Sequence, residues 1–410
     1  MIFDLKNCNV VIGSFSFWNT GSYKVGIHFF TEYFLQKGAN VYFLTLTNST
    51  SIPMFLYGLI KHNRFREVID SYKLVSKQNK EIQLENNNQL ITYSFVNTIM
   101  PMPLPFFDSY WFAKNYVKFV YPSVQSLKRR LGLKNVDIFM FDIGGMPLYD
   151  YLQADLCIYR YQDARVGKVS TRGILEYDEE VLQKADIVLP VSKPIYDYVI
   201  ENRKTSEGVY YMPNGVNIDI FLKSYPIPQE YLTLPKPIAV FVGVSSLIDW
   251  DLCFHLSKSL PDTSFVFIGR MNTLRSKIPS NFYLLGPKKH EDIPSYLQHA
   301  DVGLIPYIDC EHIRAVEKPL KFYEYIASGL PVVSVSYGAM SSMAPWAMLA
   351  DNYNEFVECI KRAVKSPLEY KQKLREVAKD FAWDKIFEKL DKIIEHHLSI
   401  KSLNSEDRKC

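Results

Sequence analysis

Cysteines are few in this sequence, and none of them stands in a recognisable motif. Six cysteines are scattered over 410 residues, without a CxxC pair and without the spacing of metal ligands. This distribution argues against a disulfide framework and against a zinc site, and it suits a reducing compartment. The chain is too long for one ordinary core, so we expect two domains.

Long apolar runs are missing as well. No stretch reaches 18 apolar residues, and the best candidate, residues 100–121, is interrupted by Asp108, Lys114 and Lys118. The opening MIFDLKNCNVVIGSF lacks the basic leader and the long apolar stretch of a signal peptide. We therefore expect a cytoplasmic protein without a membrane-spanning segment.

Two common nucleotide-binding motifs are also absent. No GxGxxG follows the first apolar run, because Gly13, Gly21 and Gly26 have the wrong spacing for it. This argues against an oxidoreductase that uses NAD or FAD. No GxxxxGK[ST] occurs either, which excludes phosphoryl transfer of the P-loop type.

The net charge is close to zero, but it is unevenly distributed. The formal charge is +3, whereas residues 51–134 hold twelve Lys and Arg against five acids, a local charge of +7. Within that region, 53–68 and 100–130 interleave aromatic residues with Lys and Arg. We interpret this composition as a surface that lies on an anionic membrane, with packing of the aromatics into the core as the alternative. No RNA-binding motif accompanies it, so we expect no nucleic acid partner.

What the sequence does have is a regular alternation of short apolar runs with longer amphipathic stretches. This alternation is typical of parallel sheets covered by helices, so we expect an α/β fold. We predict Rossmann-like domains over 1–210 and 238–380, a linker over 211–237, and a helix over 381–400 that crosses back to the first domain. The apolar runs lie at 9–15, 41–46, 137–143, 155–160, 186–192, 238–244, 264–270, 282–286, 301–307 and 330–335.

The most informative segment is 286–335. It passes through a helix into a strand that stops near Tyr307, and a second helix opens at about Pro319. In an open parallel sheet, ligands bind at the carboxyl ends of the strands, and a helix N-terminus offers N–H groups to a diphosphate. Lys321 would add a full charge there, and Glu324 could accept both hydroxyls of a ribose. The alternative is that these two residues form a solvated pair on the helix surface.

The same residues resemble a known family. ADVGLIPY (300–307) followed by KPLKFYEYIASGLPVVS (318–334) is similar to the nucleotide-sugar segment of the GT-B glycosyltransferases. Residues 17–45 and IYRYQDAR (158–165) resemble the xanthan-type glucuronosyltransferases and related teichuronic-acid-type transferases. The resemblance extends over about residues 8–395. It implies two domains that face a central cleft, with the acceptor on the N-terminal domain and the nucleotide-sugar on the C-terminal one.

Candidate donor-binding residues follow from this resemblance together with the strand ends of the second half. They are Gly243, Val244, Ser245, Arg270, Pro287, Tyr307, Leu320, Lys321 and Glu324.

The acceptor side carries the candidate base. Asp163 follows the strand at 155–160, and the resemblance implies that it takes the proton from the acceptor hydroxyl. Without that resemblance, an Asp in this position is commonly a cap or turn residue. His28 is the alternative base, although a His near a helix start is more often packed or capping. The other acceptor-side candidates are Trp18, Tyr23, Lys24 and Arg160.

One motif invites a metal interpretation. Asp249-Trp250-Asp251 is similar to the DxD that holds manganese in the other large glycosyltransferase fold. Here it opens a helix, where carboxylates suit the helix dipole without any metal. We therefore expect no metal and no cofactor, and we expect Lys321 and the adjacent helix N-terminus to stabilise the leaving group.

The sequence thus predicts an inverting, metal-independent transferase on the inner face of the cytoplasmic membrane. It would move a sugar, with glucuronic acid as one candidate, from a UDP-sugar to a lipid-linked glycan in surface polysaccharide synthesis. One alternative is a retaining transferase, because Glu317 stands at the expected spacing before Glu324. Others are a non-catalytic sugar-nucleotide-binding or scaffold protein, which would not need Asp163 in the cleft, and an epimerase of the same fold.

Overall fold

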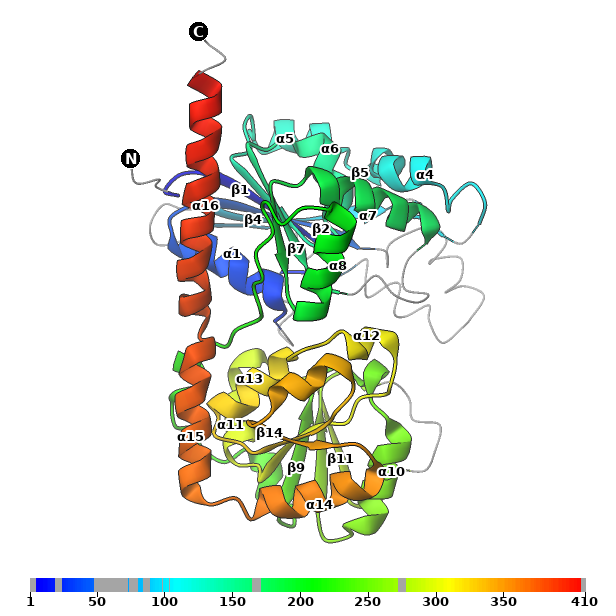
Figure 1. Cartoon of the computed structure of the whole chain (residues 1–410), viewed down its shortest axis with the longest axis vertical. Helices are drawn as coiled ribbons and strands as arrows, with labels where there is room; N and C mark the ends of the chain where they lie inside the picture. Colours follow the sequence, from blue (N-terminus) through cyan, green and yellow to red (C-terminus); the bar gives the residue numbers. More distant parts are fainter. Residues whose placement is uncertain are drawn as a thin grey trace.

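The computed structural model describes residues 5–18, 24–47, 73, 80–83, 89–97, 99–102, 104–163, 171–271 and 278–406. Within them the chain builds two sheets, one from each half of the sequence, arranged along the long axis of the molecule (Figure 1).

The first sheet is mostly parallel and has the strand order β3-β4-β2-β1-β6-β7-β8, with β5 paired to β4. Antiparallel pairing is confined to β3 and β5, which both pair with β4. All six residues of β7 are buried, as expected for a strand covered on both faces. The strands are β1 (Asn9–Ser14), β2 (Asn40–Thr47), β3 (Lys80–Gln83), β4 (Gln89–Asn97), β5 (Val120–Tyr121), β6 (Ile138–Phe141), β7 (Leu156–Tyr161) and β8 (Ile187–Pro190).

The second sheet is parallel throughout, in the order β11-β10-β9-β12-β13-β14. The sequence order reverses between β9 and β12, and such a switch point is where open α/β sheets bind their ligands. The strands are β9 (Ile238–Val242), β10 (Ser264–Ile268), β11 (Phe282–Gly286), β12 (Val302–Ile305), β13 (Val332–Val335) and β14 (Ala347–Ala350).

Helices cover these sheets and connect their strands. Those of the first half are α1 (Gly26–Gln36), α4 (Tyr110–Asn115), α5 (Val124–Arg130), α6 (Tyr149–Leu152), α7 (Arg172–Lys184) and α8 (Lys193–Arg203). Those that follow are α9 (Ile218–Leu222), α10 (Trp250–Ser259), α11 (Ile293–Gln298), α12 (Glu311–Arg314), α13 (Leu320–Ala327), α14 (Tyr353–Val364), α15 (Leu368–Ala378) and α16 (Trp383–Glu406). In Figure 1, α12 and α13 lie at the edge of the second half that faces the first half.

The C-terminal helix joins the two halves. After α15, α16 runs along the first half, beside α1 (Figure 1). Trp383 of α16 stacks on Phe29 of α1 with ring centroids 4.9 Å apart. The hydroxyl of Tyr33 donates to Asp391, and Lys37 forms an ion pair with the same carboxylate at 2.7 Å. A buried aromatic seam and a polar rim therefore fix α16 on the N-terminal half.

The structure departs from the sequence-based outline in several places. The outline lacks β3, β4, β5 and β14, none of which is a continuous apolar run of the length that the outline used, except for the very short AMLA of β14. The predicted linker contains the helix α9, and α16 continues to residue 406 instead of ending at 400. Among the described residues, no helix is both long and apolar enough to cross a bilayer.

Candidate active site

A cavity of about 320 Å³ lies at the carboxyl ends of β9, β10 and β11. Because these strands are parallel, the residues that follow them meet at one edge of the sheet, and α13 adds its first turn to the same space. The lining residues are Lys24, Val242, Gly243, Val244, Ile268, Gly269, Arg270, Pro287, Lys288, His290, Ile293, Leu320, Lys321 and Glu324.

Lys321 is the central cation of this cavity. Its Nζ lies 4.0 Å from the ring centroid of Phe241 and donates a hydrogen bond of 2.8 Å to the Tyr307 hydroxyl. Gly243 makes room for it, because a Cβ on Gly243, whose φ is +144°, would lie 2.9 Å from this Nζ. Desolvation lowers the pKa of Lys321 to about 7, against an opposing effect of the Glu324 carboxylate. Glu324 offsets this desolvation only in part, and a bound diphosphate would supply a full counter-charge.

This lowered pKa leads to a prediction about pH. A diphosphate would raise the pKa of Lys321, so above about pH 7 the binding of a UDP-sugar should take up a proton and weaken by up to about tenfold per pH unit. Calorimetry between about pH 7 and pH 9, in buffers of different ionisation enthalpy, measures both effects. In Lys321→Arg, whose side chain stays charged, the pH dependence should vanish. Equal affinity of the wild-type protein at both pH limits would contradict the prediction.

Glu324 lies on the same wall, one turn further along α13. One of its carboxylate oxygens is 2.8 Å from Nε2 of His290, and both side chains are largely buried. His290 also meets the ring of Phe29 edge-on, at 6.1 Å, across the cleft. The pair fixes the direction of the Glu324 carboxylate and leaves its other oxygen for a ligand hydroxyl.

Lys24 lines this cavity although it belongs to the N-terminal half. It forms an ion pair with Glu32 and lies 5.6 Å from the ring centroid of Phe29. The structure thus places Lys24 beside the donor candidates of the first cavity, which also include Lys321 and Arg270.

A second cavity, of about 230 Å³, adjoins the first at Leu320 and contains Asp163. Asp163 is the second residue after β7, and 55% of its side chain is exposed. Across the cleft, Nε2 of His312 on α12 lies 4.0 Å from Oδ1 of Asp163. Other lining residues lie at the start of α1, after β8, in α8 and in the segment 315–320, so residues of both halves enclose Asp163.

A buried carboxyl supports the segment that ends in Asp163. Asp142 follows β6 and accepts hydrogen bonds from the Ser14 hydroxyl at 2.6 Å and the Gly144 N–H at 2.7 Å. Gln162 donates to the same group at 3.4 Å. Burial raises the pKa of Asp142 to about 6, against the effect of these hydrogen bonds. Asp142 thus helps to fix Gln162, the residue that precedes Asp163.

Two acceptor-side predictions need correction. The guanidinium of Arg160 is buried and donates to the carbonyls of Met212 and Leu189 and to the Asn214 side chain. It therefore ties β7 to neighbouring backbone instead of facing an acceptor. Trp18 lines neither cavity, since it packs with ring centroids 5.6 Å from those of His28 and of Phe43. Tyr23 lies outside the described residues.

His28 has the contacts of a structural residue. Its Nδ1 accepts from the Val25 N–H at 3.1 Å, and Nε2 lies 3.1 Å from the carbonyl oxygen of Phe17. Desolvation lowers the pKa of His28 to about 4, although the contact with Phe17 opposes this. Both ring nitrogens are thus occupied at the start of α1, which favours a capping role over that of an alternative base.

Glu317 is held by partners from both halves. One carboxylate oxygen accepts from the Lys193 N–H at 2.9 Å and the Tyr211 hydroxyl at 3.0 Å, and the other contacts Nζ of Lys318 at 3.0 Å. Desolvation opposes its charge, but these hydrogen bonds still lower the pKa of Glu317. Together with a 2.8 Å bond from Ser192 to the Ala315 carbonyl, Glu317 joins the N-terminus of α8 to the C-terminal half.

Most of the other donor candidates line the first cavity, whereas Ser245 and Tyr307 do not. Gly243, Val244, Arg270, Pro287 and Leu320 line the first cavity together with Lys321 and Glu324. Ser245 does not, because it is buried and its N–H bonds to the Arg270 carbonyl at 3.2 Å. Tyr307 lines the second cavity and reaches the first only through Lys321.

Sequence reasoning missed Lys288, His290 and His312. The first two follow β11, so the strand-end argument that selected Arg270 could have found them. For His312 no such signal exists, because α12 is a single short turn in a polar loop.

The prediction that Asp249 caps a helix is confirmed. Its carboxylate accepts from the Leu252 N–H at 2.9 Å and from the Tyr353 hydroxyl at 2.9 Å. In the part of the chain that the structure describes, no group of three or more His, Cys, Asp or Glu is arranged to hold a metal ion.

Comparison with known proteins identifies the fold and the activity class. A family model described as "Glycosyl transferases group 1" matches residues 251–366. TuaH of Bacillus subtilis, named as a teichuronic acid biosynthesis glycosyltransferase, is 24% identical over 276 residues, which cover 60% of this chain and 69% of that protein. The UDP-glucuronate:glycolipid 2-beta-glucuronosyltransferase of Xanthomonas campestris is 23% identical over 247 residues, 58% of this chain and 60% of the relative.

Solved structures agree on the architecture. Sucrose-phosphate synthase from Thermosynechococcus elongatus superimposes with a TM-score of 0.64 at 15% identity, covering 96% of this chain and 100% of that one. Anabaena HepE in complex with UDP and glucose gives 0.65 at 11% identity, covering 94% and 98%. The two parallel-dominated sheets and these likenesses show that the chain is a glycosyltransferase with the GT-B fold, and its segment 251–366 matches the group 1 transferases.

Proposed function

We propose that this chain is an inverting transferase that uses a nucleoside diphosphate sugar, with UDP as the nucleotide and without a metal ion. The observation that carries the proposal is the pairing of two adjoining cavities. One is lined by Lys321, Arg270 and Lys288 on the C-terminal half, and the other contains Asp163 of the N-terminal half. A cationic cavity beside a cavity with an exposed carboxylate suits transfer from an anionic leaving group to a hydroxyl.

The positions of the two cavities suggest the course of the reaction. The acceptor hydroxyl attacks the anomeric carbon, its proton passes to Asp163, and the bond from that carbon to the phosphate oxygen breaks as the nucleoside diphosphate leaves. Negative charge grows on the diphosphate, next to the ammonium of Lys321 and the positive N-terminal end of α13. Because these groups are already in place, they stabilise that charge without a metal ion.

The contacts of Glu317 support inversion over retention. A retaining transferase needs a carboxylate at the donor face of the cleft, and Glu317 stood at the expected spacing. Its oxygens instead bind Lys193, Tyr211 and Lys318. Glu317 lines the same cavity as Asp163, but only 14% of its side chain is exposed and both of its oxygens have partners, whereas Asp163 is more than half exposed.

UDP is supported by what related proteins bind. HepE of Anabaena is described in complexes with UDP and with UDP-glucose, and the Xanthomonas relative is named for UDP-glucuronate. Glucuronic acid remains our candidate sugar, since Lys24 and Arg270 add positive charge to the cavity wall that could meet a uronate carboxylate. A panel of UDP-, GDP- and dTDP-sugars, measured by thermal shift with and without EDTA, tests this. Stabilisation by UDP-sugars that EDTA does not change is expected, and a preference for GDP or dTDP would contradict the assignment.

A membrane-linked acceptor is our further proposal for the partner. The helix α4 and its flanks expose large apolar side chains, which we call the α4 patch: Leu104 (51% exposed), Phe106 (58%), Trp111 (52%) and Phe119 (44%). Lys118 beside Phe119 is also exposed. Aromatic rings with an adjacent cation suit the headgroup zone of an anionic leaflet. The patch would hold the acceptor side near a lipid-linked glycan.

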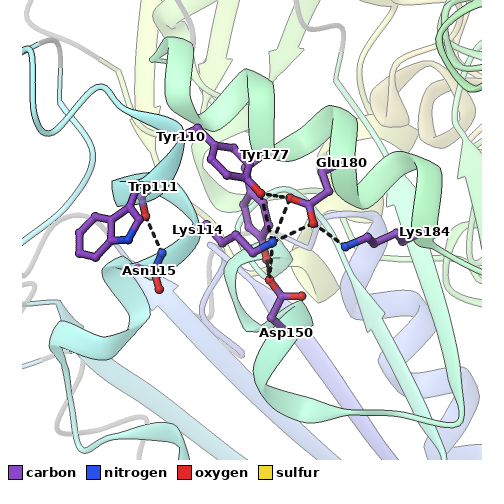
Figure 2. A network of polar contacts seen from close by, with 8 residues as sticks. All are labelled: Tyr110, Trp111, Lys114, Asn115, Asp150, Tyr177, Glu180 and Lys184. Atoms are coloured by element: carbon purple, nitrogen blue, oxygen red, sulfur yellow. Dashed lines mark hydrogen bonds and ion pairs between the residues drawn. The ribbon is translucent and has the colours of Figure 1, made fainter.

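The opposite face of α4 is anchored to the domain. Lys114 lies 2.8 Å from Glu180 of α7 and 3.5 Å from Asp150 of α6, and Figure 2 shows Trp111 pointing away from this network. The hydrogen bond to Glu180 raises the pKa of Lys114, so the pair stays charged. The exposed rings are therefore presented on a fixed support. The other basic and aromatic segment, 53–68, lies outside the described residues.

Vesicle binding tests the membrane proposal. The double variant Phe106→Ser/Trp111→Ser should weaken binding to vesicles of phosphatidylcholine and phosphatidylserine at least about tenfold, since two half-exposed rings lose their apolar contact. Binding by the wild-type protein should also fall as salt increases. Leu232→Ser, at an exposed apolar residue of the C-terminal half, is the matched control. If the double variant and Leu232→Ser bind vesicles equally well, the α4 patch is not the membrane-binding surface.

A non-catalytic sugar-nucleotide-binding protein is the remaining alternative. Such a protein would share the first cavity but would have no use for Asp163. The effect of Asp163→Asn on turnover therefore distinguishes a transferase from a binding protein.

A further inference from the structure

His312 belongs to the C-terminal half and shares the second cavity with Asp163, the proposed base. It belongs to α12, in the loop between β12 and α13, and 26% of its side chain is exposed. Its Nε2 lies 4.0 Å from Oδ1 of Asp163. This is about 1 Å longer than a hydrogen bond, so a small closing motion of the cleft would bring the two atoms into bonding distance.

The other ring nitrogen shows which tautomer this site favours. Nδ1 of His312 is buried and has no hydrogen-bond partner among the described residues. A proton on Nδ1 would leave a buried N–H without an acceptor and would turn the Nε2 lone pair toward a carboxylate. A proton on Nε2 avoids both costs and directs an N–H at Asp163. The surroundings therefore favour the tautomer that donates from Nε2.

The segment that carries His312 is already tied to the N-terminal half. Ser192 donates to the Ala315 carbonyl, and the Lys193 N–H donates to Glu317, both a few residues beyond His312. These bonds join the segment after α12 to the residues that follow β8, the strand that pairs with β7.

We propose that His312 is a positioning residue for Asp163, which rests on the proposed function of Asp163 as the base. In the closed cleft, Nε2–H of His312 donates to Oδ1 of Asp163 and orients the carboxylate, so that Oδ2 faces the acceptor hydroxyl. Because the donor comes from the nucleotide-binding half, the base is fully oriented only when the two halves have closed on both substrates.

The position of the donated proton can be tested with amide side chains. The longer amide of His312→Gln can place an N–H near the site of Nε2, whereas the shorter amide of His312→Asn mimics only Nδ1. We expect His312→Ala and His312→Asn to lower kcat about 10- to 100-fold, with the KM for the UDP-sugar within about twofold of wild type. His312→Gln should recover most of kcat. Arg314→Ala, an exposed position on the same helix, is the control for the integrity of α12.

A double-mutant cycle separates this role from general damage. When Asp163 is already Asn, the further change His312→Ala should lower kcat less than about twofold, because the group that it positions is gone. The inference is overturned if this change costs as much as it does in the wild-type background, if His312→Gln and His312→Asn are equally impaired, or if the loss falls on KM. If the Asp163→Asn variant transfers sugar as fast as the wild-type protein, the proposed function itself is wrong.

Discussion

Replacement of Asp163 by Asn is expected to lower turnover by about 10²- to 10⁴-fold, the usual contribution of a general base. The amide keeps the volume of the side chain and some of its hydrogen bonding, but it cannot accept a proton at neutral pH. Affinity for the UDP-sugar should stay near that of the wild-type protein, because the donor cavity is lined mainly by the C-terminal half and does not include Asp163. Transfer of labelled sugar to a lipid fraction gives kcat, and calorimetry gives the affinity.

Three controls make that result specific. The melting temperature of Asp163→Asn shows whether the variant folds. Glu311→Gln removes an exposed carboxylate next to His312 and should keep near-normal turnover. Near-normal turnover of a folded Asp163→Asn would exclude this residue as the base. An equal loss of turnover and of UDP-sugar affinity would point to a binding role instead.

The second large effect is expected at Lys321. Its ammonium lies in a desolvated site beside Tyr307 and Phe241, where a charge-assisted contact to a diphosphate is worth about 1.5–3 kcal/mol. Lys321→Ala should therefore weaken the binding of UDP about 10- to 150-fold near neutral pH. Calorimetry with UDP measures this directly.

The matched control for Lys321 is Lys289. This lysine is exposed and follows the same β11 loop but does not line the cavity, so Lys289→Ala should bind UDP within about twofold of wild type. If both variants lose affinity equally, the effect is one of general charge and not of a specific contact. Wild-type affinity in Lys321→Ala would refute the assignment of the diphosphate to this cavity.

Positions at strand ends could be predicted from the sequence because parallel strands bring their carboxyl ends to one edge. Gly243, Arg270 and Pro287 reach the cavity for that reason alone. Arg160 was misplaced because the expected strand ended with it, whereas β7 continues to Tyr161 and keeps the guanidinium inside. A difference of one residue in a strand end decides whether a side chain enters the core or the cleft.

Contacts across the cleft could not be predicted from the sequence. Lys24 was expected near the acceptor, but the relative placement of the two halves brings it to the donor cavity. The roles of Glu317 and His312 depend in the same way on partners more than a hundred residues distant, such as Lys193 and Asp163. No spacing within one segment encodes such contacts, since they arise only when two separately folded sheets meet.

In the proposed reaction a sugar passes from a nucleoside diphosphate to an acceptor hydroxyl in one inverting step at Asp163. The most direct measurement is the anomeric configuration of the new linkage, read by NMR after transfer from an α-linked UDP-sugar to lipid-linked acceptors in membranes of the native cell. The account predicts a β-linkage that is formed by the wild-type protein and lost in Asp163→Asn. An α-linkage, or equal product from both proteins, would contradict it.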